Sequence, residues 1–108
     1  MAAYRFNNAT ATGVGTAGTD VYSASAKCIL IGLSITNITR AALPVEVEVV
    51  KANGSTVHLT TSGRIAGGVS VDVLSGRKLV LMSQEKVRIT SKVDNAFDCV
   101  ASILEDVD

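Results

Sequence analysis

The sequence predicts an all-β fold: a single antiparallel β-sandwich of about seven to nine strands, with jelly-roll or immunoglobulin-like connections. Apolar residues make up 47% of the 108 residues, and with no Trp, two Phe and two Tyr the core must consist of Val, Ile and Leu. Short runs alternate between apolar and polar residues, and the chain reverses roughly every 8–12 residues. No stretch shows sustained helical spacing, so the pattern is typical of a sandwich or barrel.

The N-terminal part of the chain differs from the rest. Residues 4–6 are expected to form a short edge strand, and residues 7–19 are rich in Gly, Thr and Ala and almost free of large side chains. Such a segment buries too little apolar area to offset its ordering entropy. We therefore predict that residues 1–19 are a flexible arm or edge strand beside a sandwich domain of residues 20–108. A surface loop and an arm that becomes ordered against a neighbouring subunit both fit this composition.

The first half of the predicted domain contains two well-patterned strands. The longest, residues 27–38, follows a weak strand at residues 20–24, and its odd positions are expected to face the core. Gly32 inside that strand indicates a bulge or a close approach by another backbone. Pro44 can only begin a strand or lie at an edge, and Val then alternates with Glu over residues 45–49.

Sharp turns separate the strands of the second half. Asn53-Gly54 tolerates positive φ at both positions, so residues 43–50 and 56–60 are expected to form a hairpin. The glycines within residues 63–68 and Ser75-Gly76 predict two further reversals. The remaining predicted strands are residues 69–73, 78–82, 87–90 and 97–104.

The alternation also predicts which side chains are buried and which are exposed. The expected core includes Ile31, Leu33, Val47, Val71, Leu81, Ile89 and Ile103. The side chains expected at the surface are Glu46, Glu48, Asp72 and Arg88.

Composition excludes several classes of partner and compartment. Ten basic and ten acidic residues cancel and are scattered, so the basic patch of a nucleic-acid binder is missing. We expect no secretory signal and no membrane span, because the charged and apolar runs that these need are absent from the sequence. Assembly in a cytoplasm is therefore expected. Cys28 and Cys99 are expected to be buried free thiols, although the sequence leaves a disulfide open.

We predict no catalytic, metal or cofactor site. His58 is the only histidine, so the chain cannot assemble a metal cluster of the usual His and Cys kind. Nor can it assemble a Ser-His-Asp triad and keep a second histidine. His58 is expected at the surface or an interface. Glu46 and Glu48 share a strand face about 7 Å apart, as a catalytic carboxylate pair would, but alternating Glu is far commoner on a solvent face. The glycines of residues 63–68 lack the Lys-Ser/Thr of a phosphate loop. The chain is not expected to be an enzyme.

Six segments between residues 29 and 105 carry a family resemblance. They are IGLSITN (31–37), PVEVEV (44–49), IAGG (65–68), LSGRKLVL (74–81), VRITS (87–91) and DCVASILE (98–105). In this order they resemble small virion structural proteins of tailed bacteriophages, particularly cyanophages. The resemblance implies a building block of the head surface, neck or tail, such as a decoration or cement protein, that contacts major capsid or tail proteins.

Free sheet edges, which natural proteins cover or pair, predict a homo-oligomer, either a trimer or a ring. The protein is then expected in the virion after assembly in the host cytoplasm, without nucleic-acid or membrane partners. The alternative is a fibre-tip or receptor-binding module. Receptor sites usually display aromatic side chains, and this chain has four: Tyr4, Phe6, Tyr22 and Phe97.

Overall fold

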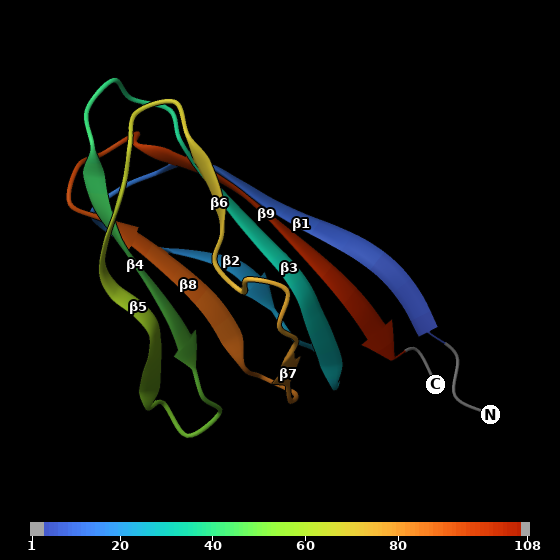
Figure 1. Ribbon diagram of the computed structural model, residues 1–108. Coiled ribbons are helices and arrows are strands. Elements are labelled where there is room, and N and C mark those ends of the chain that lie inside the picture. The colour runs from blue at the N-terminus through green and yellow to red at the C-terminus, as the bar shows by residue number, and fades with distance from the viewer. Residues whose placement is uncertain (1–3, 107–108) are drawn as a thin grey trace.

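The computed structural model describes the backbone of residues 4–106 and the side chains of residues 5–59 and 64–105. This part of the chain contains nine β-strands and no helix, so it has no helix long and apolar enough to cross a membrane. The strands form two antiparallel sheets (Figure 1), which confirms the predicted all-β sandwich. They are β1 (Tyr4–Val14), β2 (Thr19–Ser23), β3 (Cys28–Asn37), β4 (Leu43–Val50), β5 (Thr56–Ile65), β6 (Ser70–Asp72), β7 (Leu79–Leu81), β8 (Lys86–Ser91) and β9 (Phe97–Asp106).

The strand order is that of a jelly roll. One sheet has the order β1-β9-β3-β6, with β7 also paired to β3, and the other has the order β2-β8-β4-β5. Because β6 and β7 pair with successive parts of β3, they act as one interrupted strand. The result is the two-sheet, eight-strand arrangement of a jelly roll, which is one of the two connectivities that the sequence predicts.

The core lies between the two sheets and is built mainly by β3, β4, β8 and β9. Buried and half-buried side chains alternate along β4 and β8, as expected for strands with one face against a core. Five of the seven predicted core residues are at most 1% exposed, namely Leu33, Val47, Leu81, Ile89 and Ile103. For these residues the prediction is confirmed.

The predicted core face of β3 is wrong in the N-terminal half of the strand. The pairing of β3 with β9 shifts register between Leu30 and Gly32, which marks a β-bulge. A bulge inserts one extra residue and so reverses the alternation of faces. Leu30 is therefore fully buried, whereas Ile31 is only half-buried. The bulge itself was indicated by Gly32.

The predicted burial of Val71 is also wrong, since 37% of this residue is exposed. Val71 pairs with the buried Ile35, but β6 has only three residues and lies at the edge of its sheet, which leaves Val71 partly uncovered. Asp72 is exposed as predicted. The other three side chains expected at the surface are half-buried, namely Glu46, Glu48 and Arg88.

Residues 4–14 of the N-terminal segment form β1, an edge strand paired with β9 of the same chain (Figure 1). Ala9 and Ala11 pack against the core, and Val14 is only 1% exposed. The strand thus continues well beyond the predicted residues 4–6, because its backbone hydrogen-bonds to β9 where its side chains are small. Residues 1–3 of the predicted arm lie outside the described residues.

The predicted hairpin at Asn53-Gly54 is confirmed. It joins β4 and β5, and Gly54 has a φ of 90°, a conformation that side chains disfavour. The second strand is longer than predicted, because it runs through Gly63 to Ile65. The following reversal lies at residues 66–69, where the Val69 N–H donates to the Ala66 carbonyl and Gly68 has a φ of 76°.

Candidate functional site

A row of charged side chains that ends at a histidine crosses the outer face of the β2-β8-β4-β5 sheet. Its members are opposite one another in register: Asp20 beside Arg88, Arg88 beside Glu48, and Glu48 beside His58. The Arg88 guanidinium donates from Nε to Asp20 Oδ1 at 2.8 Å, and this contact raises the pKa of Arg88. Opposite charges on neighbouring strands attract, so the row stabilises the sheet.

Glu46 joins the end of this row, because it lies two residues from Glu48 on the same face of β4. One ligand atom from each of Glu46, Glu48 and His58 lies within 4.8 Å of the others. His58 Nε2 is 3.6 Å from Glu48 Oε2. The structure therefore brings the predicted carboxylate pair together with the predicted surface histidine, and we call these three residues the EEH cluster.

The hairpin turn explains how His58 reaches the two carboxylates. The hairpin is centred on Asn53, so residues at equal distances before and after Asn53 pair with each other. Glu48 lies five positions before it and His58 five positions after it, and the two are therefore opposite one another. Sequence reasoning treated these residues separately. The register implied by the turn was the signal that could have joined them.

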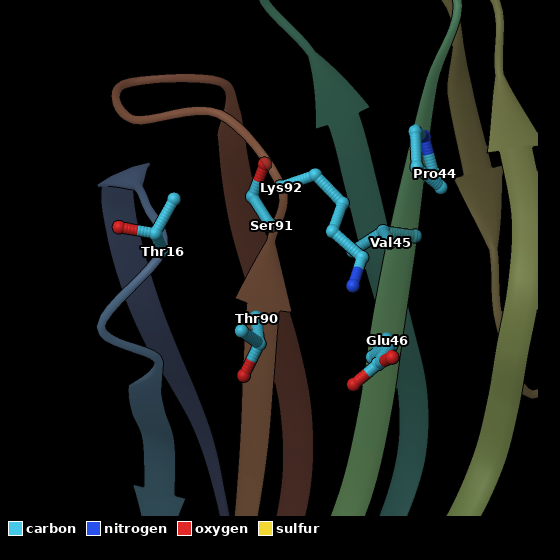
Figure 2. Close-up of a pocket in the computed structure, with 7 residues that line it drawn as sticks. All are labelled: Thr16, Pro44, Val45, Glu46, Thr90, Ser91 and Lys92. Carbon is cyan, nitrogen blue, oxygen red and sulfur yellow. The ribbon is translucent and has the colours of Figure 1, made fainter.

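A shallow pocket of about 210 Å³ borders the EEH cluster on the other side of β4. It is lined by Glu46 and Pro44 of β4, Thr90 of β8, and Thr16 and Lys92 from the connections (Figure 2). Figure 2 shows the Lys92 side chain reaching from the end of β8 toward β4, above Glu46. The pocket thus adds a cationic group near the cluster but no nucleophile with a base.

The outer face of the other sheet carries a row of apolar side chains instead. Phe6 is opposite Leu104, Leu104 is opposite Ile29, and Ile29 is opposite Val80, so the row crosses β1, β9, β3 and β7. All four point away from the core, because buried residues flank them: Ile103 beside Leu104, for example. We call this set the apolar row.

The apolar row is open to solvent at both ends. Phe6 is 76% exposed and Val80 is 53% exposed, while Ile29 and Leu104 in the middle are half-buried. Four adjacent strands at ~4.8 Å spacing make the row about 14 Å wide. Met82, just after β7, is 51% exposed. A contiguous exposed apolar set of this kind is typical of an interaction surface.

A polar cluster joins the two sheets at the end of the sandwich that carries the apolar row. Tyr22 Oη donates to Glu105 Oε2 at 2.6 Å, and Arg5 Nη2 donates to Glu105 Oε1 at 3.0 Å. The hydrogen bond from Tyr22 and then the one from Arg5 lower the pKa of Glu105, while burial and the carboxylate raise the pKa of Tyr22. These bonds link β2 in one sheet to β1 and β9 in the other.

The two cysteines are free and buried, as predicted. Burial raises the pKa of the Cys99 thiol to about 12, and burial also raises the pKa of the Cys28 thiol. Neither thiol is ionised at neutral pH, so neither is an activated nucleophile.

No protein-family model and no curated protein matches the chain. Solved structures do share its fold. A chain from the disulfide-linked pili of Bacillus endospore appendages matches with a TM-score of 0.55 and 10% identity, over 99% of this chain and 89% of that one. The VP2 protein of infectious bursal disease virus matches with a TM-score of 0.55 and 12% identity, over 94% of this chain but only 31% of VP2.

A chain from the acid-stable capsid of Helicobacter pylori bacteriophage KHP30 has nearly the same length. It matches with a TM-score of 0.50 and 12% identity, over 100% of this chain and 99% of that one. At identities this low, the three similarities show the β-sandwich fold and no more.

Proposed function

We propose that this chain is a non-enzymatic structural protein of a bacteriophage virion, which associates with itself and caps or cements the head surface or the head-tail and tail region. The observation that carries the proposal is the apolar row on a sheet face that has no covering element within the described chain. Its partners are further copies of the chain and other virion proteins, such as the major capsid or tail proteins.

Burial of the apolar row would supply the energy for this association. Removing a large apolar side chain from water contributes roughly 1.5–3 kcal/mol, and Phe6 is the most exposed large hydrophobic residue of the described part. A net charge of zero keeps the repulsion between many identical copies small. We propose a trimer or a ring as the assembled state.

The N-terminal segment has a part in this proposal. An arm that acts between subunits is one of the two roles that fit residues 1–19, and β1 supplies Phe6 to the apolar row while its backbone stays paired with β9. We propose that the segment contacts the neighbouring subunit through this side chain.

Two kinds of similarity support a role in the virion. The sequence segments between residues 29 and 105 resemble small tailed-phage structural proteins, and the jelly roll is a fold that capsid proteins use. The similarity to a phage capsid chain of nearly equal length supports the proposal through the fold alone.

The exposure of the aromatic residues favours a capping role over a receptor-binding module. Among the aromatic side chains that the structure describes, only Phe6 is largely exposed; Tyr22 is half-buried and Phe97 is fully buried. A receptor site that displays several aromatic side chains therefore has little support.

Purified particles of the phage that encodes the chain provide the test. Mass spectrometry should detect the chain as a multi-copy component, and a cryo-electron microscopy map should show the face of β1, β9, β3 and β7 against another subunit. Complete particles without the chain would contradict the proposal. A map in which that face lies toward solvent would contradict the proposed contact surface.

A further inference from the structure

We propose that the EEH cluster of Glu46, Glu48 and His58 is a binding site for a divalent transition-metal ion, of which Zn²⁺ is the representative probe. The site lies on the outer face of the β2-β8-β4-β5 sheet, whereas the apolar row lies on the other sheet. The inference is therefore independent of the proposed virion function.

The geometry of the cluster is close to that of bound zinc. Zinc binds His nitrogen and carboxylate oxygen at about 2.0–2.2 Å, so neighbouring ligand atoms of a tetrahedral site are about 3.4 Å apart. His58 Nε2 and Glu48 Oε2 are already 3.6 Å apart, and the third ligand atom, from Glu46, lies within 4.8 Å of both. Small side-chain rotations would complete the set, since the three side chains are at least partly exposed and free to adjust.

The backbone holds these ligands in place. Glu46 and Glu48 come from one strand in the middle of the sheet, and His58 comes from the adjacent strand of a tight hairpin. Sites on paired strands are more rigid than sites on loops. Three ligands leave the fourth position of a tetrahedral metal open to water or to a group from another molecule.

The donor types select the class of ion. Two carboxylates carry a charge of about −2, which neutralises a divalent cation, and an imidazole nitrogen suits zinc, copper or nickel better than calcium or magnesium. We therefore expect Zn²⁺ to bind and Mg²⁺ to bind far more weakly.

Neighbouring charges will moderate the affinity. Arg88 on β8 is beside Glu48, but its guanidinium is bonded to Asp20 of β2. Lys92 reaches toward Glu46 from the other side (Figure 2).

Isothermal titration calorimetry of the whole chain with ZnCl₂, after treatment with a chelator, tests the proposal. The wild type should bind one Zn²⁺, and His58→Ala and Glu48→Gln should each lower the affinity at least about 10-fold, the smallest loss usual even for residues that only support a metal ligand. Asp72→Asn removes the same charge from the other sheet and should leave the affinity unchanged. Thermal unfolding of each variant verifies that it is folded.

A second measurement locates the ion directly. In nuclear magnetic resonance spectra, the His58 ring signals should shift on addition of Zn²⁺ and remain unchanged with Mg²⁺. Absence of zinc binding to the wild type, or zinc binding of equal affinity in His58→Ala and Glu48→Gln, would overturn the proposal.

Discussion

At the residue scale, the bulge in β3 decides which of two neighbouring side chains enters the core. Leu30 is fully buried and Ile31 is half-buried, because the register against β9 shifts between Leu30 and Gly32. The Leu30 and Ile31 side chains each have four carbons. Truncating each of them to alanine therefore removes the same number of atoms from a buried site and from a half-buried site.

We predict that Leu30→Ala lowers the free energy of unfolding by about 2–5 kcal/mol, as large-to-small core substitutions do. Ile31→Ala should cost less than half as much, since solvent already reaches this side chain. Urea denaturation of both variants measures the difference. Equal losses, or a larger loss for Ile31→Ala, would mean that the bulge is absent and that the simple alternation of β3 is correct.

Glu105 makes stability depend on pH in a defined direction. Hydrogen bonds from Tyr22 and Arg5 hold its pKa below the usual value. A carboxyl group whose pKa is lowered by folding contributes stability above its unfolded pKa, about 4.3 for Glu. This contribution is lost as the pH falls through the folded value.

We therefore predict that wild type and Glu105→Gln differ most in unfolding free energy at neutral pH, and that the difference shrinks as the pH falls below about 4.3. Tyr22→Phe removes the stronger of the two contacts and should reduce the same dependence. Denaturation curves between pH 7 and pH 3 measure it. A difference that grows toward low pH would show that the carboxylate is not stabilised by these bonds.

The sequence correctly predicted burial where apolar and polar residues alternate without interruption. It did not predict burial that depends on contacts between segments brought together by folding. Val47 and Ile89 follow strict alternation and were predicted correctly. Asn37 was not singled out, yet it is fully buried, and its amide donates to the carbonyls of Ala41 and Ile65. No local pattern identifies such a residue, because Ala41 lies in the connection after β3 whereas Ile65 belongs to β5, 28 residues beyond Asn37 along the chain.

At the element scale, β1 contributes few large side chains to the core for its length. Its inward side chains near the middle are Ala9 and Ala11, so its attachment depends largely on backbone hydrogen bonds to β9. A strand of this kind could pair with β9 of its own chain or with that of a neighbour. In the structure, β1 pairs with β9 of its own chain.

One substitution distinguishes the two arrangements. Ala11 is directly opposite Cys99, so Ala11→Cys places two thiols on paired positions of β1 and β9. We predict that oxidation gives a disulfide-linked monomer on a non-reducing gel. The control Ala9→Cys is opposite Ala101 and should form no such bond. Disulfide-linked dimers of Ala11→Cys alone would show instead that the strand is exchanged between subunits.

The elements themselves could largely be predicted from the sequence, apart from their bounds. The turn residues Asn53 and Gly54 located the β4-β5 hairpin, although only Gly54 has the positive φ that the sequence led us to expect at both positions. Gly63 was interpreted as a turn residue, although it lies in β5. A glycine also fits extended backbone, so composition alone placed the reversal a few residues too early. Ser75-Gly76 correctly separated the strands β6 and β7, but the predicted reversal there is wrong, because both strands pair antiparallel with β3 and so run in the same direction.

At the scale of the whole molecule, the two outer faces differ in chemistry. One carries the charged row with the EEH cluster, and the other carries the apolar row. The apolar row unites four strands from distant parts of the sequence, so no sequence window contains it. It became visible only once the strand order was known, which is why the sequence predicted association without a surface for it.

Sedimentation velocity of the isolated chain over a range of concentrations tests the central claim, which is that the apolar row is a contact between subunits. The wild type should sediment as a trimer or larger ring, and the double variant Phe6→Ser, Val80→Ser should sediment as a folded monomer. Val93→Thr provides the control, because Val93 is 44% exposed but lies in the connection between β8 and β9, away from the row. A monomeric wild type, or oligomers that persist in the double variant, would contradict the claim.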